Sequence, residues 1–345
     1  MPRRMVILTE GHTNPHTAKT ATSLIRYCRD ECVALLDSDQ EGRTSQELLG
    51  VGGDLPIIAS LDAAQGADTL VIGIAPQGGK LPAAWKQIVL QAIGRGMNVI
   101  SGLHDFLGDD AEIAASAVAA GVAIHDVRRN SERDVASLRD FRPDCLRVLT
   151  IGNDCSVGKM VTAIEVSRGL AERGLDAKFL ATGQTGIMIA AEGCPVDCVV
   201  ADFLNGAVEK LVLADQHHSI LLIEGQGSLF HPSYSAVTAG LLHGCLPQAM
   251  ILCYEVGRRT IHGHDHIALP PLSVVRDVYE SLAAAMGPSR VIGISMNSRL
   301  VSADEAQRER DRLQSELHLP VCDVFRHGRQ PLVDTVADFY SEHVA

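Results

Sequence analysis

Residues 151–160, IGNDCSVGKM, follow the apolar run LRVLT and have the residue types of a phosphate-binding loop. Backbone N–H groups and the N-terminus of the helix expected after Gly158 can surround an anion, and Lys159 adds a positive charge. A strand, a glycine-bearing turn, Gly-Lys and a helix are the context that such a loop requires. The residues predicted to bind phosphate are Asn153, Asp154, Cys155, Ser156, Val157, Gly158, Lys159 and Met160.

The loop departs from the pattern G-x-x-x-x-G-K-[ST] at both ends, with Asn153 for the first glycine and Met160 for the hydroxyl residue. That hydroxyl normally ligates Mg²⁺, and a thioether is a poor ligand for a hard cation. Thr162 cannot replace it, because two residues along a helix correspond to a rotation of about 200°. The loop therefore favours a phosphate-bearing ligand that needs no metal, such as coenzyme A, over Mg-ATP.

A second group of candidate residues follows the apolar run LLI in the stretch LLIEGQGSLFHPSYSA, 221–236. Glu224 ends the expected strand and could accept a proton or hold a cation, with His231 as a second candidate base. Their alternative role is to cap or shape a turn. The glycine-rich residues that follow Glu224 could bring backbone N–H groups to a ligand; they are Gly225, Gln226, Gly227 and Ser228. The stretch LATGQTG, 180–186, has the same pattern and suits either ligand contact or a tight turn.

The stretch IHGHDHIALPP, 261–271, places His262, His264, Asp265 and His266 close together. This density raises the question of a metal, but the spacing matches neither a helical pair nor a structural zinc site. A polar loop at an active site or interface is the preferred interpretation, and no metal is expected. In the first half, His104 and Lys80 follow expected strands and are candidates to face a cleft. Residues 9–21 contain one glycine and give little support to a nicotinamide cofactor.

The composition of the 345 residues is that of an ordinary soluble α/β protein, rich in small and aliphatic residues and poor in aromatic ones. A net charge of −12 argues against nucleic acid or an anionic membrane as the main partner. The nine cysteines show no paired spacing, which favours reduced thiols and a cytoplasmic location. No apolar run reaches membrane-spanning length, and the N-terminus lacks the pattern of a signal peptide. We expect a homo-oligomer, as is common for such enzymes.

Short apolar runs alternate with helical patterns along the whole chain, which predicts an α/β fold of two domains with parallel sheets. The expected strands lie at 5–8, 33–37, 56–59, 69–75, 98–103, 122–127, 146–152, 177–183, 219–225, 249–255, 290–296 and 320–324. We predict a Rossmann-like N-terminal domain at 1–127 and a P-loop-type C-terminal domain at 146–345. The densely charged stretch between them, 128–145, reads as a linker or surface helix. Ligands should bind at the turns that follow the strands.

The motifs GNDCSVGKM and IEGQGSL together resemble those of dethiobiotin synthetase and related P-loop proteins. A closer resemblance, over essentially the whole chain, is to a family long known only as a domain of unknown function. HTAKTATSLIRY, DCSVGK and IEGQGSL are the pieces that carry it. The resemblance implies a Rossmann-like domain joined to a P-loop domain. It also implies N-acetylation of a D-amino acid, notably D-glutamate, by acetyl-CoA.

Such acyl transfer needs an anchor for the coenzyme, a base, oxyanion donors and cations for the substrate's carboxylates. We assign the base to Glu224 or His231, and the oxyanion donors to the N–H groups of residues 225–228. The predicted carboxylate partners are Arg258, Arg259 and Arg299. Cys155 could form an acyl-enzyme, but a role as a small loop residue is preferred. Two alternatives stay open: an Mg-ATP-dependent carboxylase or ligase, and a regulator that binds nucleotide without turnover.

Overall fold

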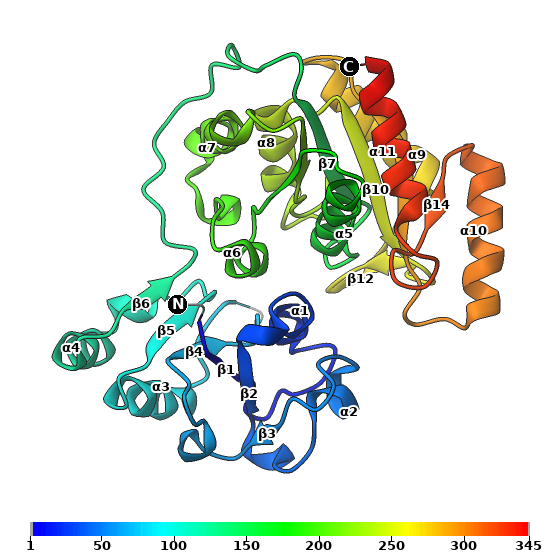
Figure 1. Cartoon of the computed structure of the whole chain (residues 1–345). Helices are drawn as coiled ribbons and strands as arrows, with labels where there is room; N and C mark the ends of the chain where they lie inside the picture. The colour runs from blue at the N-terminus through cyan, green and yellow to red at the C-terminus, as the bar shows by residue number, and fades with distance from the viewer. Residues whose placement is uncertain (1–2, 77, 344–345) are drawn as a thin grey trace. The chain divides into compact units, whose positions relative to one another are not determined.

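The computed structural model describes residues 3–76 and 78–343, and the chain divides into two compact units (Figure 1). The first unit comprises the chain up to Arg129 together with Ile187–Ala191. The second comprises Asn130–Gly186 and the chain from Glu192 onward. None of the helices in the described residues is both long enough and apolar enough to cross a membrane.

The first unit contains one parallel sheet whose strand order is β3-β2-β1-β4-β5-β6, the order typical of Rossmann folds. The strands are β1 (Met5–Leu8), β2 (Cys32–Leu36), β3 (Ile57–Ile58), β4 (Thr69–Ile72), β5 (Asn98–Ser101) and β6 (Ile124–Asp126). Helices α1 (Lys19–Tyr27) and α2 (Ser45–Leu49) contribute apolar side chains to one face of the sheet, and α3 (Trp85–Gly94) and α4 (Ala111–Ala120) to the other. The central strand β1 is buried along its whole length, as a strand covered on both faces must be.

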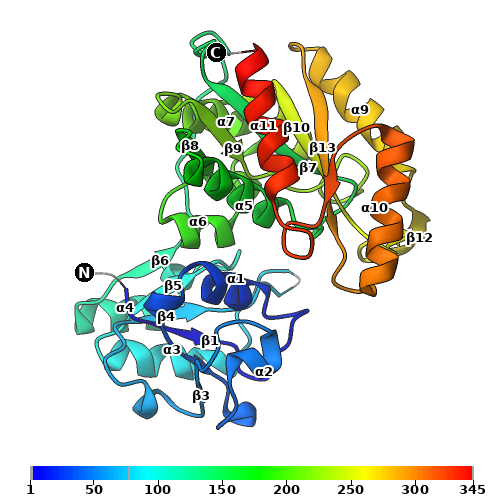
Figure 2. The same cartoon turned by 45° about the vertical axis from the view of Figure 1, so that its right-hand side comes forward.

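The second unit contains a second parallel sheet, of order β14-β13-β10-β7-β9-β8 (Figure 2). Its strands are β7 (Leu146–Gly152), β8 (Ala177–Leu180), β9 (Ile220–Ile223), β10 (Ala249–Glu255), β13 (Arg290–Asn297) and β14 (Val321–Cys322). Its helices are α5 (Lys159–Glu172), α6 (Gln184–Ala190), α7 (Ala201–Asp215), α8 (Ser235–Cys245), α9 (Leu272–Ala284), α10 (Ala303–Leu317) and α11 (Gln330–His343).

The core of the second unit lies on both faces of its sheet, because β7 alternates its side chains between them. Leu146 and Val148 pack with α5 and α11, whereas Leu149 and Ile151 pack with α7, α8 and α9. The phosphate-type loop joins the carboxyl end of β7 to α5, next to the ends of β9 and β10 in the strand order. The predicted α/β fold with two parallel sheets is confirmed.

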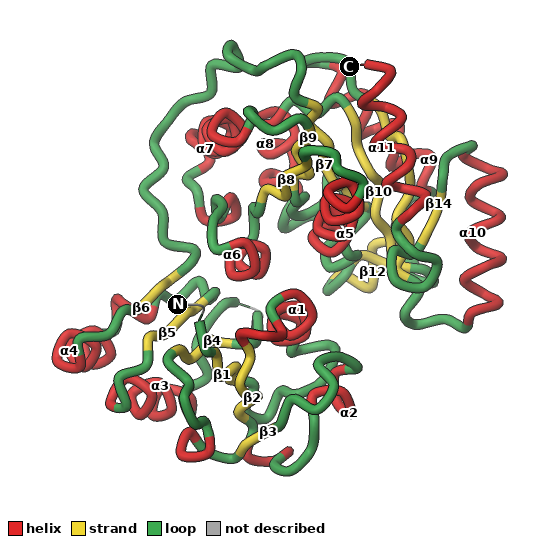
Figure 3. Tube along the Cα trace, viewed as in Figure 1, coloured by secondary structure: helices red, strands yellow, loops and turns green. Residues whose placement is uncertain are grey.

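Two segments differ from the expectation of the sequence analysis (Figure 3). Residues 127–145, all of them described, form neither a helix nor a strand, so the helical alternative for the charged stretch is wrong. The stretch that begins at 261 is not an irregular loop, because β11 (Thr260–Ile261) and β12 (His264–Ala268) form an antiparallel hairpin. Gly263 has φ +78° at the turn, a conformation that glycine adopts without strain.

Candidate functional site

The loop between β7 and α5 has the backbone shape of an anion cradle. Ser156 and Gly158 have φ values of +57° and +108°, so the chain curves twice within the loop. The first intrahelical bond of α5 runs from the Thr162 N–H to the Gly158 carbonyl. The N–H groups of Lys159 and Met160 therefore have no intrahelical partner and face the loop.

Lys159 is buried beneath the loop, and its Nζ donates to the Asp154 carbonyl oxygen at 2.8 Å. Burial lowers the pKa of Lys159, against the opposing effect of acidic groups around it. A Cβ atom on Gly152 would lie 3.2 Å from Nζ, so the small residue at the end of β7 leaves room for the ammonium group. An anion in the loop would stabilise the charged lysine.

Asp154 holds the loop in place through hydrogen bonds that use both of its carboxylate oxygens. Oδ1 accepts from the Cys155 N–H at 2.7 Å, and Oδ2 accepts from Arg258 Nη1 and the His262 N–H, each at 2.8 Å. Its side chain is fully buried. Asp154 therefore positions the loop against the segment that follows β10.

Asn153 brings an unsatisfied acceptor to the loop. The residue is 4% exposed, and within the described part of the chain its Oδ1 has no hydrogen-bond partner. Its backbone N–H donates to the Cys253 carbonyl in β10 at 3.3 Å, which fixes the residue between the two strand ends. A buried amide oxygen of this kind is suited to accept a hydrogen bond from a ligand.

The three predicted carboxylate partners have different surroundings. Arg258 donates to Glu255 Oε1 through Nε at 3.1 Å and Nη2 at 2.8 Å, besides its bond to Asp154. Burial lowers the pKa of Arg258, but the hydrogen bonds to Asp154 and Glu255 outweigh it and raise the pKa above its usual value. Arg299 also contacts Glu255, with Nη2 2.9 Å from Oε2, and its side chain is 38% exposed. Arg259 is exposed. A substrate carboxylate can therefore reach Arg259 and Arg299 more readily than Arg258.

Glu224 follows β9 and is 4% exposed. Its Oε2 accepts hydrogen bonds from the N–H groups of Thr182 and Gly183, at 3.0 and 3.2 Å. Burial nevertheless raises the pKa of Glu224 to about 7, against the lowering effect of these two bonds. Glu224 thus caps the turn before α6. Its role as a base stays a prediction, for which a pKa near neutrality is suitable.

The turn after Glu224 is packed closely against β7. The Gly225 N–H donates to Thr150 Oγ1 at 3.0 Å, so this group is not available as the oxyanion donor proposed for it. A Cβ atom on Gly225 would lie 1.6 Å from the Thr150 carbonyl oxygen. Gly227 has φ +63°, and Ser228 is fully buried. The N–H groups of residues 226–228 are the ones that stay proposed as oxyanion donors.

His231 is 2% exposed and has both ring nitrogens engaged with the backbone. Nδ1 lies 3.1 Å from the Ser233 nitrogen and accepts its N–H, so Nε2 carries the proton and donates to the His262 carbonyl at 3.1 Å. A ring nitrogen of His231 also lies within 4.8 Å of Cys155 Sγ and an Asp154 oxygen. Hydrogen bonds already occupy both Asp154 oxygens and both His231 ring nitrogens.

Met160 and Thr162 at the start of α5 occupy different surroundings. Met160 is partly exposed on the first turn. The Thr162 hydroxyl lies 2.7 Å from Ser295 Oγ of β13, and the residue is buried. Thr162 therefore points into the sheet, as its position on the helix predicts, and does not replace the missing metal ligand.

Two further residues shape the site: Tyr279, which has no signal in the sequence, and Thr182, which lies in the stretch 180–186 considered for ligand contact or a turn. Tyr279 of α9 donates its hydroxyl to the Gly152 carbonyl at 2.9 Å and accepts from the Leu229 N–H at 3.2 Å. Thr182 donates its hydroxyl to the Glu224 carbonyl at 2.6 Å. Tyr279 lies more than a hundred residues from the loop in the sequence and reads as one apolar position of a helix. Only the fold brings it to the end of β7.

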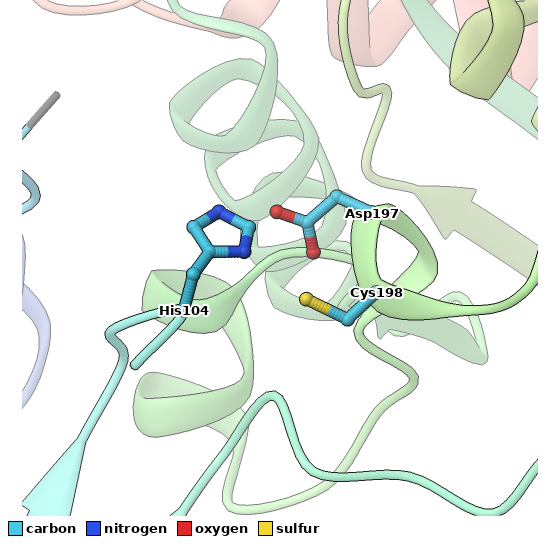
Figure 4. Close-up of side chains that lie close together, drawn as sticks. All are labelled: His104, Asp197 and Cys198. Atoms are coloured by element: carbon cyan, nitrogen blue, oxygen red, sulfur yellow. The ribbon is translucent and has the colours of Figure 1, made fainter. Parts of the chain in front are cut away.

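His104, a candidate from the sequence, is drawn in Figure 4 with Asp197 and Cys198. In the first unit, His104 follows β5 and its N–H donates to the Gly79 carbonyl at 3.0 Å. In the second, Asp197 and Cys198 lie on the 3-10 helix Val196–Cys198. Asp37, at the position of a ribose-binding acid, is buried and accepts from the Thr13 hydroxyl and the Asp39 N–H. This arrangement uses Asp37 to shape a turn.

Comparison with known proteins identifies relatives along nearly the whole chain. Residues 134–333 match the P-loop domain of DUF1611, a domain of unknown function, and residues 38–130 match its Rossmann-like N-terminal domain. A D-glutamate N-acetyltransferase from Tritonibacter scottomollicae is 43% identical over 276 residues, which cover 79% of this chain and 82% of the relative. A protein of the same name from a Pseudoalteromonas species is 34% identical, with coverages of 93% and 95%.

A solved structure has the same fold from end to end. The crystal structure of a DUF1611 family protein from Anabaena variabilis superimposes with a TM-score of 0.92 and 36% sequence identity, covering 97% of this chain and 99% of that one. This agreement confirms the resemblance on which the sequence interpretation depends. The protein belongs to the DUF1611 family, in which a Rossmann-like domain precedes a P-loop domain.

Proposed function

We propose that this protein is a D-glutamate N-acetyltransferase that uses acetyl-CoA as the acetyl donor. One observation carries the proposal: a phosphate-type loop with no hydroxyl for Mg²⁺ lies in a chain whose relatives at 43% and 34% identity bear that name. The Mg-ATP-dependent alternative is not favoured, because Met160 replaces the metal ligand and the Thr162 hydroxyl contacts β13.

The residues of the loop fit a phosphate-bearing coenzyme. The free N–H groups at the start of α5 and the buried Lys159 supply donors and positive charge for the phosphates. The Asn153 Oδ1 supplies an acceptor for a ligand N–H, such as an amide of the coenzyme or the ammonium group of the amino acid. Among the described residues, the Asn153 Oδ1 has no hydrogen-bond partner and the first N–H groups of α5 have no intrahelical one, so the proposal gives these groups a ligand to bind.

The reaction requires the ammonium group of the amino acid to lose a proton before its nitrogen attacks the thioester carbonyl carbon. Glu224 is our proposed base, because its pKa of about 7 lets it hold and release a proton at neutral pH. The tetrahedral oxyanion would be stabilised by N–H groups of residues 226–228. Collapse of this intermediate breaks the carbon–sulfur bond and expels the coenzyme A thiolate, while the nitrogen gives up its second proton, which protonates the thiolate. The products are N-acetyl-D-glutamate and coenzyme A. Arg299 and Arg259 are the proposed partners of the substrate carboxylates.

The proposed setting is the cytoplasm, where acetyl-CoA is available and thiols stay reduced. All nine cysteines lie in the described part of the chain, and none of them forms a disulfide there. Neither nucleic acid nor a membrane is a proposed partner of this acidic chain. A homo-oligomeric state stays a prediction.

The direct test offers acetyl-CoA with a panel of D- and L-amino acids and follows the release of free thiol. We expect release with D-glutamate and much less with L-glutamate. A panel in which no D-amino acid releases thiol would exclude the proposal. Release of ADP from Mg-ATP in a parallel assay would favour the ligase alternative instead.

A further inference from the structure

A cluster of histidine and aspartate side chains lies at the edge of the second unit's sheet opposite to the phosphate loop. Asp215 ends α7, and His217 and His218 lie in the turn that leads into β9. One ligand atom of each residue lies within 4.8 Å of the others. In a parallel sheet this turn is at the amino edge, whereas the phosphate loop follows the carboxyl end of β7.

A fourth residue orients one of the histidines. Asp176, which precedes β8, lies with Oδ1 2.6 Å from His218 Nδ1. In the neutral imidazole this bond places the proton on Nδ1, and the lone pair of Nε2 is then left to bind an ion. A carboxylate behind a histidine is the arrangement that supports metal-ligating imidazoles in proteins.

The cluster is also open enough to admit an ion. His217 is exposed, and Asp215 and His218 are partly buried. The two imidazole rings lie beside each other in the turn, with centroids 4.2 Å apart and a tilt of 38°. The Asp154, Cys155 and His231 group differs in this respect, because hydrogen bonds already use its donor atoms.

We propose that Asp215, His217 and His218 bind one divalent transition-metal ion of the zinc type, with Asp176 as the supporting residue. Two imidazoles and a carboxylate suit Zn²⁺, Ni²⁺ or Cu²⁺, whereas Mg²⁺ and Ca²⁺ prefer sites made of oxygen ligands. The ion joins the end of α7 to the start of β9. It therefore stabilises the fold and takes no part in acetyl transfer.

The test is titration of the full-length, tag-free protein with Zn²⁺ by calorimetry, together with melting temperatures with and without the ion. We expect one equivalent bound and a raised melting temperature, with no comparable shift from Mg²⁺. The double variant His217→Gln/His218→Gln should lose this equivalent, and Asp176→Asn should bind Zn²⁺ about 10- to 100-fold more weakly. His125→Gln, at an exposed histidine of β6, serves as the matched control.

Two results would overturn the proposal: no Zn²⁺ bound by the wild type, or the same equivalent and affinity in the folded double variant. Cys155→Ala tests whether Zn²⁺ binds at the phosphate loop instead. If this variant loses the bound Zn²⁺, the assignment to Asp215, His217 and His218 is also wrong. If the double variant does not fold, a zinc-edge anomalous diffraction map of the wild type decides. A peak between Asp215, His217 and His218 supports the site, and a peak only elsewhere contradicts it.

Discussion

The side chains at the phosphate loop fall into two groups: some hold the loop in position, and others are placed to contact a ligand. Asp154 and Arg258 bind each other and neighbouring backbone groups, so they set the loop's position. The buried Lys159 ammonium group donates to the Asp154 carbonyl oxygen. The buried Asn153 Oδ1 has no hydrogen-bond partner among the described residues. The sequence singled out Asn153, Asp154 and Lys159 as loop residues, and Arg258 as a partner for the substrate's carboxylates. It could not separate holding the loop from binding a ligand, because these two roles depend on distances.

Glu224→Gln tests the assignment of the base. The pKa of about 7 means that the wild-type carboxylate becomes available as pH rises through neutrality, so kcat should rise between about pH 6 and 8. The glutamine keeps the hydrogen bonds from Thr182 and Gly183 but cannot take the proton. We expect a loss of about 100-fold or more in kcat, and loss of this limb from the pH profile. Unchanged turnover across the range would rule out Glu224 as the base.

The same variant makes a prediction about stability that does not depend on activity. Because burial raises the pKa of Glu224 from 4.5 to about 7, ionisation costs the fold stability as pH rises through that interval. At pH 8 the variant should unfold with a free energy about 1–3 kcal/mol higher than the wild type, and near pH 4 the difference should vanish. Urea unfolding at both pH values measures this. A variant less stable at pH 8 would mean that the carboxylate is needed as a cap.

Among the secondary-structure elements, the strands of the two parallel sheets were predictable, whereas the hairpin of β11 and β12 and the start of α6 were not. Buried parallel strands such as β7 and β10 read as continuous apolar runs, so their positions followed from the sequence. The hairpin of β11 and β12 was not recognised, because its residues are polar and partly exposed and have no alternating apolar pattern. Residues 184–186 were interpreted as part of a turn, yet they begin α6.

Gly225→Ala tests the close approach of the turn after β9 to β7. The added methyl group would sit 1.6 Å from the Thr150 carbonyl oxygen, so the turn must move. We expect the free energy of unfolding to fall by at least about 2 kcal/mol. Gly94→Ala is the matched control: it ends α3, has nothing within 4 Å, and should be neutral or stabilising by up to about 1 kcal/mol. Equal stability of the two variants in urea would contradict the described packing.

At the scale of the whole molecule, the order of the domains was predictable, but the path of the chain was not. Residues 187–191 belong in sequence to the P-loop half, yet they group with the first unit. Met188 of α6 is 2% exposed and packs in a core cluster with Met5 and Ile7, and its carbonyl accepts from Arg3 Nη2 at 3.0 Å. This grouping depends on tertiary packing that no local pattern encodes.

Met188→Ala should therefore destabilise the first unit, although the substitution lies in the sequence of the second. Removing a buried methionine side chain typically costs about 2–5 kcal/mol. We expect faster amide hydrogen exchange in β1, at residues 5–8. Met286→Ala, at a residue that is 45% exposed, is the control and should leave exchange unchanged. Exchange that quickens only in the second unit would show that Met188 does not pack with β1.

We propose that residues 153–160 bind the phosphates of acetyl-CoA without a metal. The most direct test is calorimetric titration of coenzyme A into the wild type and Lys159→Ala, each in excess EDTA. Removing a buried cation next to bound phosphate should cost about 2 kcal/mol or more, which is a rise in Kd of about 30-fold. Binding by the wild type in EDTA with this weakening in the variant is the predicted result. Equal affinity in both proteins, or no binding until Mg²⁺ is restored, would contradict the account.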